Sequence, residues 1–312
     1  MHYLRPDYLE RFYCSGESCT VPCPAPADMT WTHTLGDLCE TGVCLSCPQG
    51  TGLILLHSAP TVFHADRDSA LAAPITGVTQ DQLALMQDAR KTVDIILQNR
   101  SLPFRSNMML SLIYGFEFEP MISSGSRYAY DEMDWGFTEQ PYRQLSYALT
   151  AQGNWDQKRK NLLGILTQMQ ELFCADALLG DHLTRTISML EPLSGEEFRS
   201  LREDFDQYIN PREYLFENLL VYYNHRYFLS HAQEATVLPG VRLSAVSFAV
   251  IRAMAIRLYR DTGILTDNAF SALCRHWARC TEDLPGMPEL LTEKFRTDPL
   301  YSQDRLQCML WQ

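Results

Sequence analysis

Apolar residues recur every three or four positions along most of the chain after about residue 50, which predicts a series of amphipathic helices. Thr79 and Gln82 have the spacing of a capping box, so the first long helix is expected to run from there to about Arg100. Pro103 is a favoured first-turn residue and predicts a second helix, over about 103–117. Further helices are expected over about 154–175, from 194 through at least 208, and over about 211–229, 243–260, 267–280 and 286–297.

The first 50 residues differ from the rest because they show no sustained period of a helix or of a strand. Such a stretch cannot build a packed core by itself, and a bound metal is one way to stabilise it. Convincing strand alternation is scarce elsewhere as well. We therefore predict a mainly α protein, in which an irregular, Cys-rich, metal-binding segment (residues 1–50) precedes a multi-helix domain (residues 51–312).

The stretch from Ser123 to Pro141 reads SSGSRYAYDEMDWGFTEQP and is aromatic, acidic and glycine-containing. We interpret it as a long loop. Loops of this length inside compact domains are often functional, whereas the simpler explanation is a variable insertion.

The net charge of the chain bears on which classes of binding partner are expected. The chain has 26 Lys and Arg against 38 Asp and Glu, a formal net charge of −12. An acidic surface repels phosphate backbones and anionic lipids, so neither nucleic acid nor membrane is an expected partner. The most apolar stretch, from Leu243 to Tyr259, carries Arg252 and is shorter than the ~20 residues of a spanning helix. Because the N-terminus also lacks a signal-peptide run, we expect a cytoplasmic protein.

Clustered cysteines in a reducing compartment indicate metal or redox chemistry rather than structural disulfides. The N-terminal segment contains C-x(4)-C-x(3)-C followed by C-x(4)-C-x(2)-C, and the second run has the spacing of plant-type ferredoxins. An iron–sulfur cluster, a zinc site that also uses His33, and no metal at all are three alternatives that the spacing leaves open. The six cysteines are Cys14, Cys19, Cys23, Cys39, Cys44 and Cys47.

The predicted helix YLFENLLVYYNHRYFL is apolar nearly all round, yet it carries polar residues at helical spacing. Glu217 and Asn224 share one face, and Asn218 and His225 share the neighbouring face. Polar groups on such a helix must be hydrogen-bonded or lie against a cavity. A pocket for an ammonium group or for the polar ends of a cofactor is one hypothesis, with the faces of tyrosines such as Tyr222 beside the cation.

The alternative for the same helix is a satisfied interhelical network that includes Arg226. Arg252 of the next apolar helix is interpreted either as a buried partner of Glu217 or as a charge at the rim of the pocket. No G-x-G-x-x-G, P-loop, H-E-x-x-H or G-x-S-x-G motif occurs in the chain, so a Rossmann-type cofactor site has no support.

Several segments resemble the bacterial flagellin lysine-N-methylases, in an order that spans most of the chain. RPDYLERFYCSGESCTVPC is similar to the opening of that family, and LSCPQGTGLILL to its S-C-P motif and the helix that follows. LQNRSLPFRSNMMLSL fits the next helix pair. FENLLVYYNHRYF resembles the family's E-N-y-L-v-n-Y segment and is the most specific match in the body of the chain.

The resemblance implies methyl transfer from S-adenosylmethionine to lysine side chains of flagellin, with a cysteine-bound [4Fe-4S] cluster nearby. By the match, Cys14, Cys19, Cys23 and Cys47 would be cluster ligands, with zinc as the alternative metal. Glu217 and Asn218 would act at the catalytic site, and Tyr222, Asn224 and Arg226 would contact the cofactor.

The chain also departs from the family pattern. Pro24 stands where the family has the second cysteine of a C-C pair, and the stretch between Cys23 and Cys47 is short and lacks the Y-P-R motif. Two other hypotheses therefore stand beside an enzyme: a non-catalytic zinc- or iron-binding interaction module, and an inactive methylase homologue.

Overall fold

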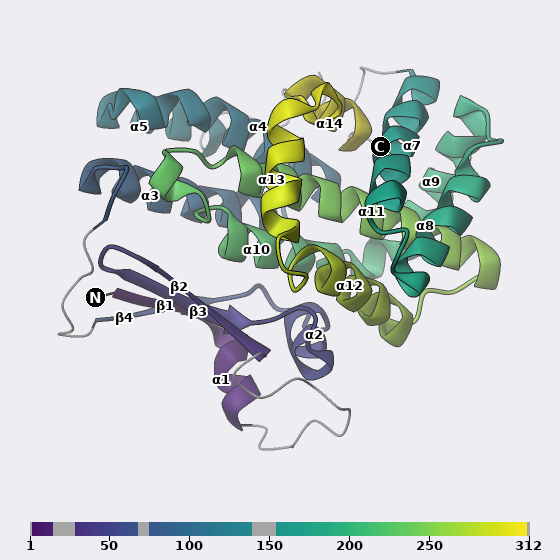
Figure 1. The fold of residues 1–312 in the computed structure, drawn as a ribbon, viewed down its shortest axis with the longest axis horizontal. Coiled ribbons are helices and arrows are strands. Elements are labelled where there is room, and N and C mark those ends of the chain that lie inside the picture. The colour runs from purple at the N-terminus through teal and green to yellow at the C-terminus, as the bar shows by residue number, and fades with distance from the viewer. Residues whose placement is uncertain (1, 15–28, 68–74, 139–153, 311–312) are drawn as a thin grey trace.

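The computed structural model describes residues 2–14, 29–67, 75–138 and 154–310 (Figure 1). Its N-terminal part contains β1 (His2–Pro6), α1 (Asp7–Cys14), β2 (Thr30–Leu35), β3 (Leu38–Val43), α2 (Pro48–Leu55) and β4 (Phe63–Arg67). The rest is helical: α3 (Gln80–Leu97), α4 (Phe104–Ser124), α5 (Arg127–Thr138), α7 (Trp155–Leu172), α8 (Ala177–Leu190), α9 (Gly195–Ile209), η2 (Asn210–Arg212), α10 (Tyr214–Tyr227), η3 (Ala232–Glu234), α11 (Leu238–Thr262), α12 (Asp267–Thr281), α13 (Met287–Thr297), η4 (Pro299–Tyr301) and α14 (Gln303–Leu310). The mainly α fold class is confirmed.

The start of α3 shows why the helices could be predicted. The Thr79 hydroxyl accepts the Gln82 N–H at 3.2 Å, and the Gln82 side chain accepts the Thr79 N–H at 2.9 Å. This capping box satisfies two backbone donors at the helix terminus. The apolar stripe that follows, including Met86 and Val93, is buried. The capping residues and the buried apolar stripe thus both indicate a helix over this segment.

A four-stranded sheet in the N-terminal part was not predicted. Its order is β2-β3-β1-β4, with β1 parallel to β3 and the other two pairs antiparallel. β2 and β3 form a hairpin through a two-residue turn in which Gly36 has φ +57°, a conformation that favours glycine. Strand β3 is buried along nearly its whole length, so it lacks the polar–apolar alternation by which strands are recognised.

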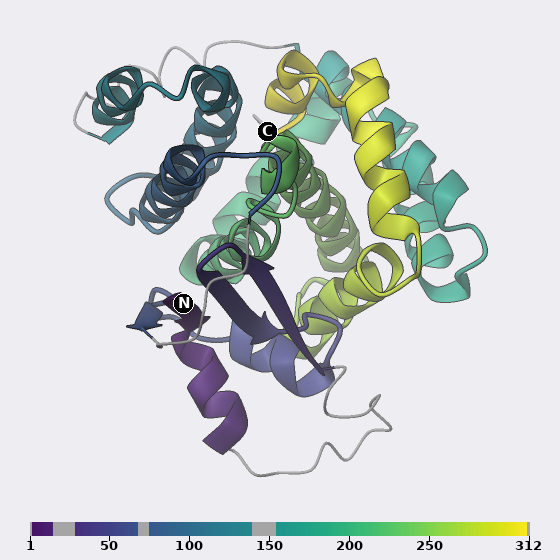
Figure 2. The same ribbon diagram turned by 60° about the vertical axis from the view of Figure 1, so that its left-hand side comes forward.

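The sheet packs against the helical body through α3 and α10. His225 of α10 lies against Trp31 of β2 and Phe63 of β4, with ring centroids 5.2 and 4.5 Å apart. Beside this contact, Arg90 of α3 forms an ion pair with Glu40 of β3, and both side chains are buried. Helix α1 lies on the other side of the sheet, away from the body (Figures 1 and 2). The N-terminal part and the body therefore share one buried interface.

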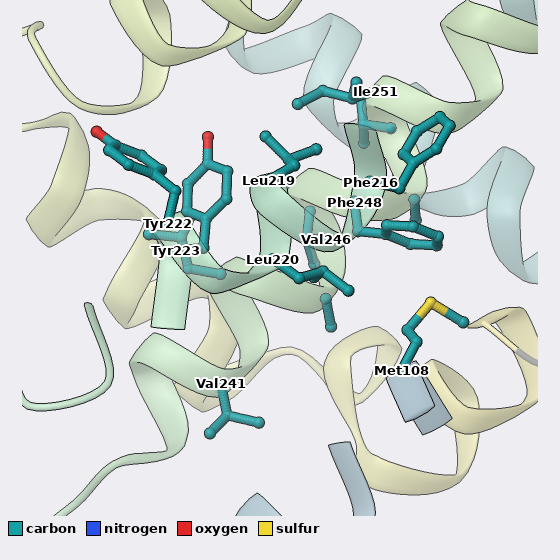
Figure 3. Packing of buried hydrophobic residues seen from close by; sticks show 14 of the residues in the cluster. Met108, Phe216, Leu219, Leu220, Tyr222, Tyr223, Val241, Val246, Phe248 and Ile251 are labelled. Carbon is teal, nitrogen blue, oxygen red and sulfur yellow. The ribbon is translucent and has the colours of Figure 1, made fainter. Parts of the chain in front are cut away.

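Helices α10 and α11 run through the centre of the body (Figure 2). Phe216 of α10 packs on Phe248 of α11, and their rings belong to an apolar cluster that includes Met108 of α4 (Figure 3). A Cβ on Gly240 would lie 2.1 Å from the carbonyl oxygen of Tyr227, so glycine permits this close approach of α11 to α10. Among the described helices, none combines the length and apolarity needed to cross a bilayer.

The interpretation of 123–141 as a loop was wrong over most of its length. α4 extends to Ser124, and α5 occupies Arg127–Thr138; residues 139–141 lie outside the described part of the chain. Tyr130 and Phe137 pack against α4 residues, and Asp134 accepts hydrogen bonds from Thr92 and Tyr114 at 2.6 and 2.7 Å. These three α5 residues recur at helical spacing, a signal that the acidic and glycine-containing composition obscured.

We expect the Tyr114→Phe substitution to lower the free energy of unfolding by about 1.5–3 kcal/mol, because it removes the hydrogen bond of a buried hydroxyl to a partly buried carboxylate. Denaturant titration would measure the loss. Tyr128→Phe is the matched control: Tyr128 is 73% exposed and donates to Glu132, so its loss is expected to stay within about 0.5 kcal/mol. Equal effects of the two substitutions would contradict this account of how α5 is held.

Candidate functional site

Helix α10 carries the residues that the sequence singled out and is the structural link between the N-terminal part and the body. Every residue from Leu215 to His225 is buried. The helix contacts α2, α3 and α11, so its polar side chains point toward several different neighbours. The structure therefore distributes these residues over distinct environments instead of one pocket.

Glu217 forms a bidentate ion pair with Arg100, which lies in the turn between α3 and α4. Its two carboxylate oxygens accept from Arg100 Nη2 at 2.8 Å and Nε at 3.1 Å. A third hydrogen bond, 2.6 Å long, joins Arg100 Nη1 to the carbonyl oxygen of Ser58. The Glu217 side chain is 7% exposed, whereas that of Arg100 is 44% exposed. The carboxylate is thus inside the protein and its cation is at the surface.

A cleft with a volume of about 240 Å³ opens beside this ion pair. One wall comes from the α3–α4 turn and the start of α4, and the other from η2 and the first turn of α10. Phe104 and Tyr214 contribute apolar surface to it. The polar side chains that line it are Arg100, Asn107, Asn210, Glu213 and Glu217.

The sequence analysis singled out only Glu217 among these five residues, and two of the four that it missed, Glu213 and Asn107, are buried or partly buried acceptors. Burial raises the pKa of the Glu213 carboxyl, with Arg252 opposing the shift. Asn107 is 2% exposed; its Nδ2 donates to the Asn99 carbonyl at 2.6 Å, while its Oδ1 has no hydrogen-bond partner among the described residues. Glu213 precedes Glu217 by four positions, so helical spacing could have found it. Asn107 carried no such signal.

Asn218 connects α10 to the chain that follows α2. Its Nδ2 donates to the carbonyl oxygens of Leu55 at 3.1 Å and His57 at 2.8 Å. These contacts satisfy two backbone acceptors at and beyond the C-terminal end of α2. Asn218 lies next to Glu217 in sequence, but it is not among the side chains that line the cleft.

Asn224 faces α3 rather than the cleft. Its Nδ2 donates to the Asp94 carboxylate at 2.7 Å and to the carbonyl oxygen of Arg90 at 3.2 Å. Burial raises the pKa of Asp94 to about 7, against the opposing effects of the Asn224 hydrogen bond and the Arg90 charge. Although Glu217 and Asn224 share a helix face, they line different cavities.

Tyr222 and Arg226 meet at a buried carboxylate, Glu282. The Tyr222 hydroxyl donates to Glu282 at 2.9 Å and accepts from the backbone N–H of Leu45 at 3.1 Å. Arg226 Nη1 donates to the same carboxylate at 2.6 Å and to the Tyr222 hydroxyl. Glu282 has no exposed side-chain surface. This network joins α10, the end of α12 and the turn before α2.

The cysteines of that turn are close to the same network. Burial raises the pKa of the Cys44 thiol to about 11, with nearby Arg226 acting in the opposite direction. Cys47 caps α2, and its Sγ accepts the Gly50 N–H at 3.4 Å. No group of three or more potential metal ligands occurs within residues 2–14, 29–67, 75–138 and 154–310. Cys19, Cys23 and the side chain of Cys14 lie outside the described atoms, so the ligand set stays a prediction.

Arg252 is buried, but it does not pair with Glu217. It forms an ion pair with Asp206 of α9, which also contacts Arg105 at 3.2 Å. Neither Asp206 nor Glu282 stood out in the sequence, because each reaches its partner across a helix–helix interface. The pairing of charges was decided by packing, not by local spacing.

Comparison with known proteins identifies one family. Residues 90–309 match the model of the FliB lysine N-methylase C-terminal domain, and this range contains the whole of α10 and every side chain that lines the cleft. The six clustered cysteines precede the matched range. Neither the curated proteins nor the solved structures that were compared give a match.

Proposed function

Because this chain belongs to the FliB lysine N-methylase family, we propose that it transfers methyl groups from S-adenosylmethionine to lysine side chains of flagellin in the cytoplasm. The observation that carries the proposal is the family match over more than two thirds of the chain. The acidic cleft lies inside the matched range and supports the proposal, because carboxylates suit an ammonium substrate.

The reaction sets two tasks for the protein. A lysine ammonium group has no lone pair, so it must lose a proton before its nitrogen can attack the methyl carbon. The new N–CH₃ bond then forms as the S–CH₃ bond of the sulfonium breaks, and the electron pair stays on sulfur. Partial loss of hydration in the cleft favours the neutral amine, and a carboxylate there can hold the lysine and accept the proton. Glu217 is the residue that we propose for this role.

We place Asn218 in a positioning role. Its two hydrogen bonds hold α10 against the residues at the end of α2. Cys47 caps the N-terminus of α2, which has eight residues and therefore spans about 12 Å. Asn218 therefore ties Glu217 to a helix whose other end carries a proposed metal ligand.

The proposed metal centre uses Cys14, Cys19, Cys23 and Cys47 for a [4Fe-4S] cluster, with zinc as the alternative. The surroundings of Cys47 fit a ligand: the thiol is buried at a helix N-terminus and accepts a backbone N–H. When bound, a cluster supplies a one-electron centre and a cross-link between the segments that hold it. Tyr222, Asn224 and Arg226 stay our proposal for contacts to S-adenosylmethionine, and Tyr222 and Arg226 lie beside the turn that leads to Cys47.

The proposal is tested with protein purified without oxygen. We expect methyl groups on flagellin lysines in the presence of S-adenosylmethionine, detected by mass spectrometry, and about four irons and four sulfides per chain. Cys47→Ser is expected to lose the metal, whereas Cys174→Ser, at an exposed cysteine in the helical body, keeps it. No added methyl on any lysine would overturn the proposal. About one zinc per chain without turnover would favour a non-catalytic interaction module.

A further inference from the structure

We propose that the cleft beside the α3–α4 turn binds the ammonium group of a lysine side chain. Asn107, Glu213 and Glu217 accept its N–H groups, and Arg100 occupies this position until the substrate displaces it. The proposal rests on the proposed function for the identity of the ligand. The sequence suggested one carboxylate, that of Glu217. The cleft adds Asn107 and Glu213 as further acceptors, and Arg100 as a cation of the protein itself that a substrate can displace.

Asn107 gives the first indication of a ligand. A buried amide oxygen without a partner costs about 1–3 kcal/mol, so protein interiors rarely keep one. Its orientation is defined, because Nδ2 donates to the Asn99 carbonyl and leaves Oδ1 as the free acceptor. Asn107 is among the residues that line the cleft, and because its Oδ1 is itself buried, the side chain must turn toward the cleft to meet a donor from a bound molecule.

The two carboxylates give the second indication. Glu213 and Glu217 are four residues apart and both line the cleft. An ammonium group carries three N–H donors and no acceptor. Together with Asn107, the carboxylates offer three acceptors, which matches this donor count. The aliphatic stem of a lysine would lie along Phe104 and Tyr214.

The size of the cleft limits what it can hold. Pockets for drug-sized ligands have volumes of about 300–1,000 Å³. The cleft has a volume of about 240 Å³ and is open to solvent, which suits one side chain of a protein substrate better than an adenosyl cofactor. We therefore assign it to the lysine.

Arg100 shows that the site already accepts a cation. Its guanidinium makes two hydrogen bonds to Glu217 and is 44% exposed. An incoming ammonium can replace it, because the new cation would again pair the buried Glu217 carboxylate while the partly exposed guanidinium returns to water. The hydrogen bond from Arg100 to the Ser58 carbonyl gives the displaced side chain a second anchor near the cleft.

The test is direct binding of a small probe, N-acetyl-lysine methylamide, to the full-length protein, measured by calorimetry without S-adenosylmethionine. We expect Arg100→Gln to bind the probe about tenfold more tightly, because the competing cation is gone. Glu217→Gln and Glu213→Gln are each expected to bind it about tenfold more weakly. Arg296→Gln is the matched control: Arg296 has a similar exposure of 51%, pairs with Glu234, does not line the cleft and should leave binding unchanged.

The proposal is overturned if Arg100→Gln binds the probe no more tightly than the wild-type protein, or if Glu217→Gln binds it equally well. Because Arg100 is at the surface, its variant is expected to stay folded, and an unchanged circular-dichroism spectrum would verify this. Probe binding that follows the expected order without methyl transfer would support this site and contradict the proposed function. Methyl transfer together with probe binding that is insensitive to all three variants would support the proposed function and contradict this site.

Discussion

Replacing Arg226 with alanine is expected to lower the free energy of unfolding by about 3–5 kcal/mol, because Glu282 then stays buried without its cation. The Glu282 side chain has no exposed surface, and burial raises its pKa against the attraction of Arg226. Arg226 also lies over the faces of Trp31 and Tyr227, at 5.8 and 5.2 Å from the ring centroids. Its loss therefore removes packing as well as charge. Denaturant titration at neutral pH measures the effect.

Two controls separate the buried charge from other causes. Arg127→Ala breaks an ion pair between half-exposed side chains, with Asp88, and is expected to cost no more than about 1 kcal/mol. The double variant Arg226→Leu, Glu282→Leu removes both charges and should recover most of the loss. If the double variant is as unstable as Arg226→Ala, the unpaired carboxylate is not the cause.

The second large effect is the pH dependence of stability that Asp94 produces. Its pKa in the folded protein is about 7, against a usual value of 3.8. Between these values the folded chain keeps a proton that the unfolded chain has lost, so stability falls as the pH rises. The shift corresponds to about 4 kcal/mol. Asp94→Asn removes this dependence, so it should equal the wild-type protein at about pH 4 and exceed it by up to about 4 kcal/mol at about pH 8.

Urea titrations of both proteins at the two pH values would test this expectation. Asp88→Asn is the control on the same helix, because Asp88 is partly exposed and pairs with Arg127 and Lys91 at the surface. A constant difference between Asp94→Asn and the wild-type protein at all pH values would show that Asp94 does not titrate in this range. The Asn224 hydrogen bond can persist in the variant, since an asparagine oxygen also accepts.

Both predictions concern how α10 is held, and α10 carries Glu217. Asn224 joins it to α3, Asn218 joins it to the end of α2, and Tyr222 and Arg226 join it to α12. An active-site carboxylate must stay within a small distance of its productive position. We infer that this polar network orients Glu217 while leaving its partner Arg100 exposed.

The helices were predictable because their signals are local. The capping box at Thr79 lies within four residues, and the buried stripe that follows repeats at 3.6 residues. The sheet was not predictable in the same way. Its strands have five or six residues, and β1 pairs with segments more than thirty residues away. Helix α5 was missed because its composition suggested a loop, although Tyr130, Asp134 and Phe137 have helical spacing.

The candidate site, like the fold, has features that were predictable from the sequence and features that were not. The family, the series of helices and the polar residues on an apolar helix could be predicted from the sequence, because motifs and periodicity are properties of neighbouring residues. No sequence pattern indicated that Arg252 pairs with Asp206, that Asn224 bonds to Asp94, or that Glu217 pairs with Arg100. Those partners come from other helices, and the packing of helices brings them together. The same packing places Asn107 opposite α10 in the cleft, a position that no local pattern records.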